Sequence, residues 1–378
     1  MNLFRYHVIS AWLPGLLGML IAGILQAQPV SSSCWPSYRG DPQLTGNSPA
    51  RIRLPFRLLW TYKTGDAIKS SPVICDGHIV VGSTNGKIYA LSTDGKLQWS
   101  YQAGSSVEAP PLILLKTVYA ASMDGFLFAL DAATGNLKWK YETGGQMAGS
   151  PNWVVGSDRK KVKILIGSYD FCMHCVDAVT GKGLWKQETG NYINGAPALW
   201  GKTAVFGGCD GLLHLTDTDS GKEIRQTDVE TYIPASAAIS GRKAWFGNYD
   251  GEFFCVDLES GKIVWKNTGG GPFLASPAIA GSRVVTGAQN KQVYCFDALT
   301  GTLNWKFKTL GKVDASPVIC GNQVVIASAD GRIRVLDLDT GAELWIYEIG
   351  SPVYSTPAVT SKLLVAGADD GTIYAFGL

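Results

Sequence analysis

The stretch that decides the fold is ALTGTLNWKFKTLGKVDASPVI, residues 298–319, which holds a Thr-Gly pair, a tryptophan in an alternating segment, a loop and a Ser-Pro. Near-copies occur at residues 132–153, 258–279 and 338–359. The tryptophan after each turn recurs as Trp60, Trp99, Trp139, Trp185, Trp265, Trp305 and Trp345. Arg225 takes its place once, and only the third unit is longer than the others. A fixed period of about forty residues is typical of a solenoid, a propeller or an array.

Each unit contains four short alternating segments. In residues 314–350 these are DASPVIC, QVVIASAD, RIRVLDLD and AELWIYEI, separated by Gly-Asn, Asp-Gly and Thr-Gly pairs. This pattern predicts four antiparallel strands, which at this repeat length form a propeller blade. The last unit stops before its tryptophan strand, whereas RLLWTYKTG at residues 57–65 is a tryptophan strand with no unit before it. We therefore predict an all-β, eight-bladed β-propeller of four-stranded antiparallel blades, closed by the N-terminal strand, which completes the last blade.

The N-terminus predicts export. The segment MNLFRYHVISAWLPGLLGMLIAGILQAQP has a basic residue near its start, an apolar run and a small residue at Ala27. This layout predicts a signal peptide at residues 1–27, followed by a lead-in segment at 28–56 and a single propeller domain at 57–378. An uncleaved membrane anchor and lipid attachment at Cys34 are the alternatives. The formal net charge of +2 shows no basic excess, so nucleic-acid binding is not expected.

The recurring tryptophans and most of the eight cysteines are interpreted as structural. A catalytic residue is needed once, whereas a tryptophan in seven units buries a large ring between neighbouring sheets. Cys175, Cys255 and Cys295 share one repeat position, and Cys75 and Cys320 share another. Most cysteines are therefore predicted to be small buried residues of separate blades that do not meet.

One repeat position varies more than the rest. Three residues before the proline of each first segment stand Lys69, Glu108, Ala148, Asn194, Pro234, Leu274, Asp314 and Tyr354. The first strand of a propeller blade lines the axis, so these eight residues are predicted to ring one mouth of the channel. Glu108, Asn194 and Asp314 offer oxygen ligands for a hard cation, Lys69 a partner for an anion, and Tyr354 a ring for stacking. The alternative is a solvated position that is simply unconstrained.

The third unit carries an insertion, VVGSDRKKVKI, in its first hairpin. Its residues Arg159, Lys160 and Lys161 are candidates for contact with an acidic partner, although solvated hairpin tips of this kind are common. The pair Cys172 and Cys175 has an odd spacing that places the two side chains on opposite faces of a strand. His78, His174 and His214 have no ligand-like spacing and are interpreted as ordinary surface or core histidines.

The units DAATGNLKWKYETG, DALTGTLNWKFKTLG and DLDTGAELWIYEIG, with the opening WPSYRGDPQLTG, resemble the pyrroloquinoline-quinone (PQQ)-type propeller repeat over residues 35–378. One branch of this superfamily, the BamB-type outer-membrane assembly lipoproteins, is a scaffold of similar length without a cofactor. Another comprises longer quinone-dependent dehydrogenases, some with adjacent cysteines or a C-x-x-C-H haem motif, and this sequence has neither motif.

The resemblance favours an exported, non-catalytic scaffold with no cofactor, metal or catalytic residue. We expect it to be a monomer that contacts protein partners at the bacterial cell envelope. It would be periplasmic or secreted, or associated with the outer membrane, and would touch a membrane only through an N-terminal anchor or lipid. The first alternative is a compact alcohol or sugar dehydrogenase with PQQ and Ca²⁺ at the channel mouth. A glycan or small-ligand binder is the second alternative.

Overall fold

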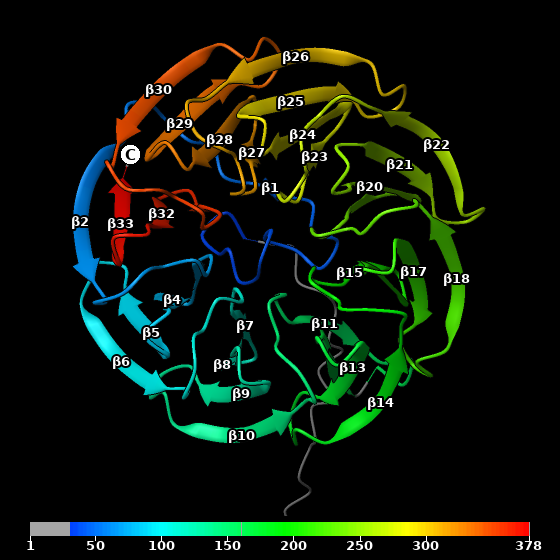
Figure 1. Ribbon diagram of the computed structural model, residues 1–378. Helices are drawn as coiled ribbons and strands as arrows, with labels where there is room; N and C mark the ends of the chain where they lie inside the picture. The colour runs from blue at the N-terminus through cyan, green and yellow to red at the C-terminus, as the bar shows by residue number, and fades with distance from the viewer. Residues whose placement is uncertain (1–30, 160, 378) are drawn as a thin grey trace, which may run out of the picture.

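The computed structural model describes residues 31–159 and 161–377, which form a ring of eight sheets around a central axis (Figure 1). The described residues contain strands and turns and no helix. The predicted signal peptide, residues 1–27, and Lys160 lie outside the described residues. The prediction of an all-β, eight-bladed propeller is confirmed.

Blades 1 to 4 follow one another along the chain, each with its first strand near the axis and its fourth strand at the rim (Figure 1). Blade 1 contains β3 (Val73–Cys75), β4 (His78–Gly82), β5 (Lys87–Ser92) and β6 (Leu97–Gln102). Blade 2 contains β7 (Leu112–Leu114), β8 (Thr117–Ala121), β9 (Phe126–Asp131) and β10 (Leu137–Glu142). Blade 3 contains β11 (Asn152–Val155), β12 (Val162–Gly167), β13 (Cys172–Asp177) and β14 (Gly183–Glu188). Blade 4 contains β15 (Ala198–Trp200), β16 (Thr203–Gly207), β17 (Leu212–Asp217) and β18 (Glu223–Asp228).

Blades 5 to 8 complete the circle. Blade 5 contains β19 (Ala238–Ser240), β20 (Lys243–Gly247), β21 (Phe253–Asp257) and β22 (Lys262–Asn267). Blade 6 contains β23 (Ala278–Ala280), β24 (Arg283–Ala288), β25 (Gln292–Asp297) and β26 (Leu303–Lys308). Blade 7 contains β27 (Val318–Cys320), β28 (Gln323–Ser328), β29 (Arg332–Asp337) and β30 (Glu343–Glu348), with the short β1 (Asn47–Ser48) added in parallel to β27. Blade 8 contains β31 (Ala358–Val359), β32 (Leu363–Gly367), β33 (Thr372–Gly377) and β2 (Arg57–Lys63).

Ring closure joins the two ends of the chain. Strand β2 pairs antiparallel with β33, and Trp60 lies opposite Ala375. The blue and red strands lie side by side in Figure 1. The predicted closure by the N-terminal strand is confirmed, and it leaves blade 8 with the same four strands as the other blades.

The rim tryptophans dock each blade on the next. Trp139 of blade 2 shows the pattern. Its Nε1 donates a hydrogen bond to the Ala178 carbonyl of blade 3 at 3.1 Å, and its ring lies over Gly181 of the Thr-Gly turn in that blade. Gly181 has φ of +73°, and a Cβ there would lie 2.6 Å from the indole ring, so the turn requires glycine. The aliphatic stem of Arg225 occupies the equivalent place over Gly261. The same contact therefore survives, with a smaller apolar surface, where the tryptophan is replaced.

The lead-in segment runs through the axis and takes hydrogen bonds from the inner strands. The backbone N–H two residues after the aligned proline position donates to a lead-in carbonyl at 2.7 to 2.9 Å in six blades. These pairs are Ile74 with Trp35, Ile113 with Pro36, Leu199 with Pro42, Ile239 with Gln43, Ile279 with Thr45, and Ile319 with Gly46. Inner-strand groups that would face an empty channel are thereby satisfied by main chain.

A disulfide between Cys34 and Cys75 fixes the start of the lead-in to blade 1. The prediction that cysteines do not meet is therefore wrong for Cys75, because its partner lies outside the repeats and could not be aligned with them. The other six cysteines are free, and all but Cys209 are buried, as expected. Because the Cys34 sulfur is bonded to Cys75, it is not available for lipid attachment. The alternative of lipidation at Cys34 is therefore wrong.

A belt of hydroxyl groups links the blades near the axis. At five of the eight blade junctions, from blade 4 round to blade 1, the hydroxyl of the residue before the aligned proline position accepts a hydrogen bond of 2.8 to 3.0 Å from a backbone N–H of the preceding blade. The acceptors are Ser236, Ser276, Ser316, Thr356 and Ser71. This belt explains why small residues precede the proline in the sequence.

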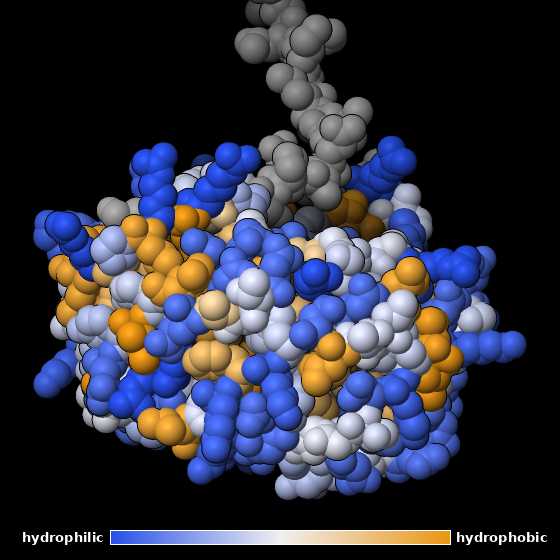
Figure 2. Space-filling model, turned by 90° about the horizontal axis from the view of Figure 1, so that it is seen from above, coloured by the Kyte–Doolittle hydropathy of each residue, from blue (hydrophilic) through white to orange (hydrophobic). Residues whose placement is uncertain are grey.

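No helix among the described residues is long and apolar enough to cross a membrane. The edge-on view in Figure 2 shows hydrophobic side chains in small groups separated by hydrophilic ones. Scattered exposed hydrophobic residues are normal on a protein surface.

Candidate binding site at the channel mouth

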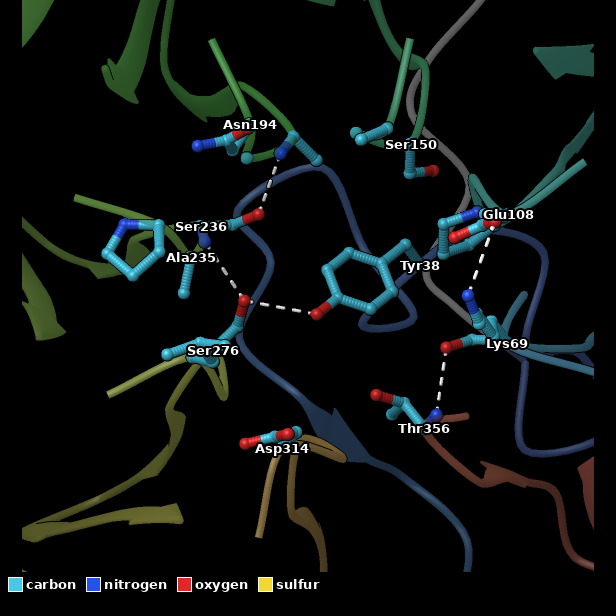
Figure 3. Close-up of a pocket in the computed structure, with 18 of the residues that line it drawn as sticks. Tyr38, Lys69, Glu108, Ser150, Asn194, Ala235, Ser236, Ser276, Asp314 and Thr356 are labelled. Atoms are coloured by element: carbon cyan, nitrogen blue, oxygen red, sulfur yellow. Dashed lines mark hydrogen bonds and ion pairs between the residues drawn. The ribbon is translucent and has the colours of Figure 1, made fainter. Parts of the chain in front are cut away.

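The eight variable residues, each in the loop just before the first strand of its blade, line a single cavity of about 170 Å³ at one end of the axis (Figure 3). Lys69, Glu108, Asn194, Asp314 and Tyr354 are therefore brought together, with Ala148, Pro234 and Leu274 completing the ring. The hydroxyl belt lies two residues after these positions in the chain and joins the blades from blade 4 round to blade 1. The mouth thus carries different side chains at equivalent positions of a hydrogen-bonded ring.

The carboxylates of the mouth are paired with lysines of the same chain. Lys69 Nζ lies 3.5 Å from Glu108 Oε1, and Lys312 Nζ lies 3.4 Å from Asp314 Oδ2. Lys312 Nζ also lies 5.6 Å from the centre of the Tyr354 ring. Asp314 Oδ1 is buried and has no hydrogen-bond partner among the described residues. The cavity therefore has little net charge but keeps an acceptor available.

A tyrosine from the lead-in forms the floor of the cavity. The Tyr38 hydroxyl is 3.0 Å from Ser276 Oγ and 2.9 Å from Ser316 Oγ, both members of the hydroxyl belt. Its ring lies in the middle of the channel in Figure 3. The repeat alignment missed Tyr38 because the lead-in is outside the repeats.

An aromatic sector lies beside the cavity on the same face, formed by Tyr169, Phe171, Tyr192, Tyr232 and Tyr249 of blades 3, 4 and 5. Tyr192 contacts Tyr169 and Phe171 with ring centres 4.8 and 5.1 Å apart, and Tyr232 stacks on Tyr249 at 4.5 Å. Burial, with nearby Cys209 and Glu108, raises the pKa of Tyr169. The Cys209 N–H donates to the Tyr192 carbonyl at 2.8 Å, and Cys209 Sγ accepts a hydrogen bond from Asn194 of the mouth, so the sector adjoins the mouth.

The sequence of the repeats contains a signal for this sector. In every blade the turn between the second and third strands donates a backbone hydrogen bond to the residue five before the aligned proline position. These sixteen positions hold four tyrosines, all in three adjacent blades. The bonded pairs are Ala67/Thr84, Ser106/Met123, Gln146/Tyr169, Tyr192/Cys209, Tyr232/Tyr249, Pro272/Gln289, Lys312/Ala329 and Pro352/Asp369.

The basic hairpin of blade 3 lies at the opposite ends of these strands. Arg159 and Lys161 are exposed, and Lys160 lies outside the described residues. Asp219 of blade 4 holds the hairpin through Lys163 Nζ at 2.6 Å and through the Ser157 hydroxyl. These bonds lower the pKa of Asp219 well below its usual range. The hairpin is therefore anchored to blade 4. It lies at the end of the strands that is opposite to the mouth.

The histidines and cysteines of blades 3 and 4 make repeated local contacts. Asp170, Cys172 and His174 have ligand atoms within 4.8 Å of one another, a set that sequence reasoning missed. However, the bond from Asp170 to a residue four positions later recurs as Asp210 to His214, Asp330 to Arg334 and Asp370 to Tyr374. We therefore interpret it as a contact that stabilises the turn. Cys172 and Cys175 are both buried and free, and His78 bonds to Gln98 at the surface.

These features together define the class of protein. Eight four-stranded blades, docked by a rim tryptophan on a Thr-Gly turn, make this chain a PQQ-like β-propeller. The family model of the outer membrane protein assembly factor BamB matches residues 57–163. A second family model, the beta-propeller of the beta-alanine-activating enzyme, matches residues 147–378, which is more than half of the chain. The chain belongs to this beta-propeller family.

Solved structures of different activities share the fold. BamB from Moraxella catarrhalis has a TM-score of 0.74 and 18% identity, and the match covers 86% of this chain and all of that one. A europium-containing methanol dehydrogenase has a TM-score of 0.76 at 14% identity, covering 92% of this chain and 98% of that one. Quinohemoprotein alcohol dehydrogenase from Comamonas testosteroni has a TM-score of 0.77 at 16% identity, covering 91% and 80%. Among curated proteins no significant sequence match is found. At these identities the similarity establishes the fold alone.

Proposed function

We propose that the protein is an exported, non-catalytic binding scaffold that contacts protein partners at the cell envelope. The proposal rests on the small size of the cavity at the mouth, where Tyr38 forms the floor and the volume is about 170 Å³. Pockets for drug-sized ligands occupy roughly 300–1,000 Å³, so the mouth does not enclose such a ligand. A larger cavity of about 1190 Å³ lies on the side of the lead-in, beside Pro36, Ile74 and Trp153, and it leaves room there for a segment of a partner protein.

The residues of the mouth do not fit a quinone with Ca²⁺. A Ca²⁺ ion takes 6–8 oxygen ligands, whereas Glu108 and Asp314 are each engaged by a lysine of the chain. The Asn194 amide donates to Cys209 Sγ at 2.9 Å. Within residues 31–159 and 161–377, the only cluster of three His, Cys, Asp or Glu ligand atoms is the one around His174. This chemistry supports the scaffold over the dehydrogenase.

The basic hairpin supports contact with an acidic partner. Arg159 and Lys161 are exposed on a hairpin whose Ser157 and Lys163 are bonded to Asp219 of blade 4. Electrostatic complementarity of this kind increases association rates and selects partners of opposite charge.

The cofactor alternative is tested by calorimetric titration with pyrroloquinoline quinone, with and without Ca²⁺. We expect no saturable binding. Micromolar binding that weakens when Glu108 and Asp314 are replaced by alanine would refute the scaffold and lead to a screen of alcohols.

The partner contact is tested by comparing proteins captured from envelope extracts by the wild type and by the variant Arg159→Glu with Lys161→Glu. A partner should be recovered about tenfold less with this variant, as expected for the loss of charge pairs. Lys222→Glu, at an exposed turn of the neighbouring blade, is the matched control. Equal capture by all three proteins would show that the hairpin is not the contact.

A further inference from the structure

The exposed aromatic side chains of the described residues are concentrated in one place. Phe171, Tyr192 and Tyr249 are 42%, 44% and 40% exposed, and all belong to the aromatic sector. The other large hydrophobic side chains that are exposed in the described part of the chain are aliphatic. Exposed aromatic rings beside a polar cavity mark a binding surface, since a chance distribution would spread them around an eightfold ring.

The aliphatic side chains of the sector loops are turned inward. Met147, Ile193, Val229 and Ile233 are at most 2% exposed, so they do not add to the surface. The groups that remain available are the faces and hydroxyls of the tyrosine rings. Rings with neighbouring hydrogen-bonding groups, and without exposed aliphatic residues, suit a ligand that has apolar C–H faces and many hydroxyls. A pyranose ring has this combination.

The cavity extends the surface with polar groups. Asn194 connects the cavity to the aromatic sector. It lines the cavity and bonds to Cys209, which lies between Tyr192 and Tyr232 along the chain. Asp314 Oδ1 is a buried acceptor without a partner in residues 31–159 and 161–377. An acceptor of this kind is costly unless a donor reaches it, and a sugar hydroxyl is such a donor.

We propose that the aromatic sector and the mouth cavity together form a binding site for an extended, β-linked saccharide, with sugar rings stacked on Tyr192 and Tyr249 and a terminal ring in the cavity. The site goes beyond the proposed contact with a protein partner and uses the opposite face of the propeller. An extended chain is favoured because the aromatic pairs are spread across three adjacent blades, whereas the cavity holds only a small group.

The experiment is calorimetric titration with cellohexaose, chitohexaose and xylohexaose. We expect saturable binding of at least one oligosaccharide, weakened about tenfold or more by Tyr192→Ala and by Tyr249→Ala. Tyr192→Phe, which keeps the ring, should retain most of the affinity. Leu310→Ala is the matched control, because Leu310 is 67% exposed and belongs to blade 7.

A second measurement uses Cys209, the only partly exposed free cysteine of the described residues. Bound saccharide should slow its alkylation in the wild type and leave it unchanged in Tyr192→Ala. The hairpin variant Arg159→Glu with Lys161→Glu should bind saccharide normally, which separates this site from the proposed protein contact.

The proposal is overturned if none of the three oligosaccharides binds, or if binding is unaffected by both alanine variants. It is also overturned if the tyrosine variants abolish capture of a protein partner while saccharides have no effect, because the sector would then be a protein-docking surface.

Discussion

The two ends of the axial channel are built on different rules. At the lead-in end, lead-in carbonyls accept hydrogen bonds from equivalent backbone N–H groups of six blades, and a disulfide holds the segment in place. At the mouth, eight equivalent positions carry different side chains around one cavity. Main-chain bonding requires no particular side chain, so the repeats can remain alike at the lead-in end. The difference teaches that the lead-in end holds the ring together, whereas the blades differ from one another at the mouth.

The strongest way to break this comparison is deletion of residues 31–56. The deletion removes the acceptors of six inner strands and four buried side chains, Trp35, Leu44, Ile52 and Phe56. Burial of four such side chains contributes about 6–12 kcal/mol, which is comparable to the stability of a domain. Circular dichroism melts should show loss of cooperative unfolding. A normal melt would show that the lead-in is dispensable, and Leu310→Ala, at an exposed loop position of blade 7, should melt like the wild type.

The disulfide gives the next largest effect. It closes a loop with a sequence separation of 41, so Cys34→Ser with Cys75→Ser should lower the free energy of unfolding by about 2–4 kcal/mol. Denaturant titration measures the change, and reductant should have the same effect on the wild type. Cys209→Ser, which replaces a free cysteine of blade 4, is the control. Equal stability of the double variant and the wild type would contradict a role for the clasp.

His174 and His214 sharpen the comparison between repeated and individual positions of the blades, because they occupy equivalent places in β13 of blade 3 and β17 of blade 4. Burial lowers the pKa of His174 despite its bond to Asp170. Burial also acts to lower the pKa of His214, but hydrogen bonds to Asp210 and Glu223 outweigh it and raise this pKa. Blade 3 has Gly183 where blade 4 has Glu223, which explains the difference.

The two histidines should therefore stabilise the protein at opposite ends of the pH range. The contribution of His214 is present below an unfolded pKa of about 6.5 and is lost as the pH rises through its higher folded pKa. That of His174 is present above about 6.5 and is lost as the pH falls toward its lower folded pKa. At about pH 5.5, His214→Gln should cost about 1.5–3 kcal/mol, and the cost should shrink at about pH 8. Imidazole titrations by NMR check the order of the two pKa values, and the reverse order would refute this account.

The smallest expected effect is at Tyr38, where the two ends meet. Tyr38→Phe removes the hydroxyl that bonds to Ser276 and Ser316 and should lower the free energy of unfolding by about 1 kcal/mol. Tyr354→Phe at the rim of the mouth serves as the control and should have a smaller effect. Equal effects in denaturant titrations would mean that the lead-in does not support the mouth through this contact.

The parts of the molecule that repeat could be predicted from the sequence, and the parts that lie outside the repeats could not. The regular spacing of the tryptophans from Trp60 to Trp345 predicts the number of blades. The unpaired tryptophan strand at residues 57–65 predicts that the N-terminus completes the last blade. Alignment on the proline brings Lys69, Glu108 and Asp314 to one mouth, because equivalent positions in a ring must face the same axis.

Three features escaped the sequence for physical reasons. The lead-in has no counterpart in the blades, so neither its path through the axis nor the Cys34–Cys75 bond follows from the period. The pairing of the mouth carboxylates with lysines depends on side-chain geometry, as between Lys312 and Asp314. The aromatic sector depends on two loops that meet through one backbone hydrogen bond in each blade, as between Tyr232 and Tyr249.

The pairing of β2 with β33 has a consequence for how the chain is made. Strand β2 is among the first segments of the propeller to be synthesised, and its partner is the last. Until residues 372–377 exist, β2 has no neighbour in its own sheet, and the growing array has two free ends with unpaired strand edges. A product cut short by only one strand would keep nearly all its blades and still be an open arc, prone to pairing with other chains. The chain therefore remains prone to aggregation until its last strand has been synthesised and has paired with β2.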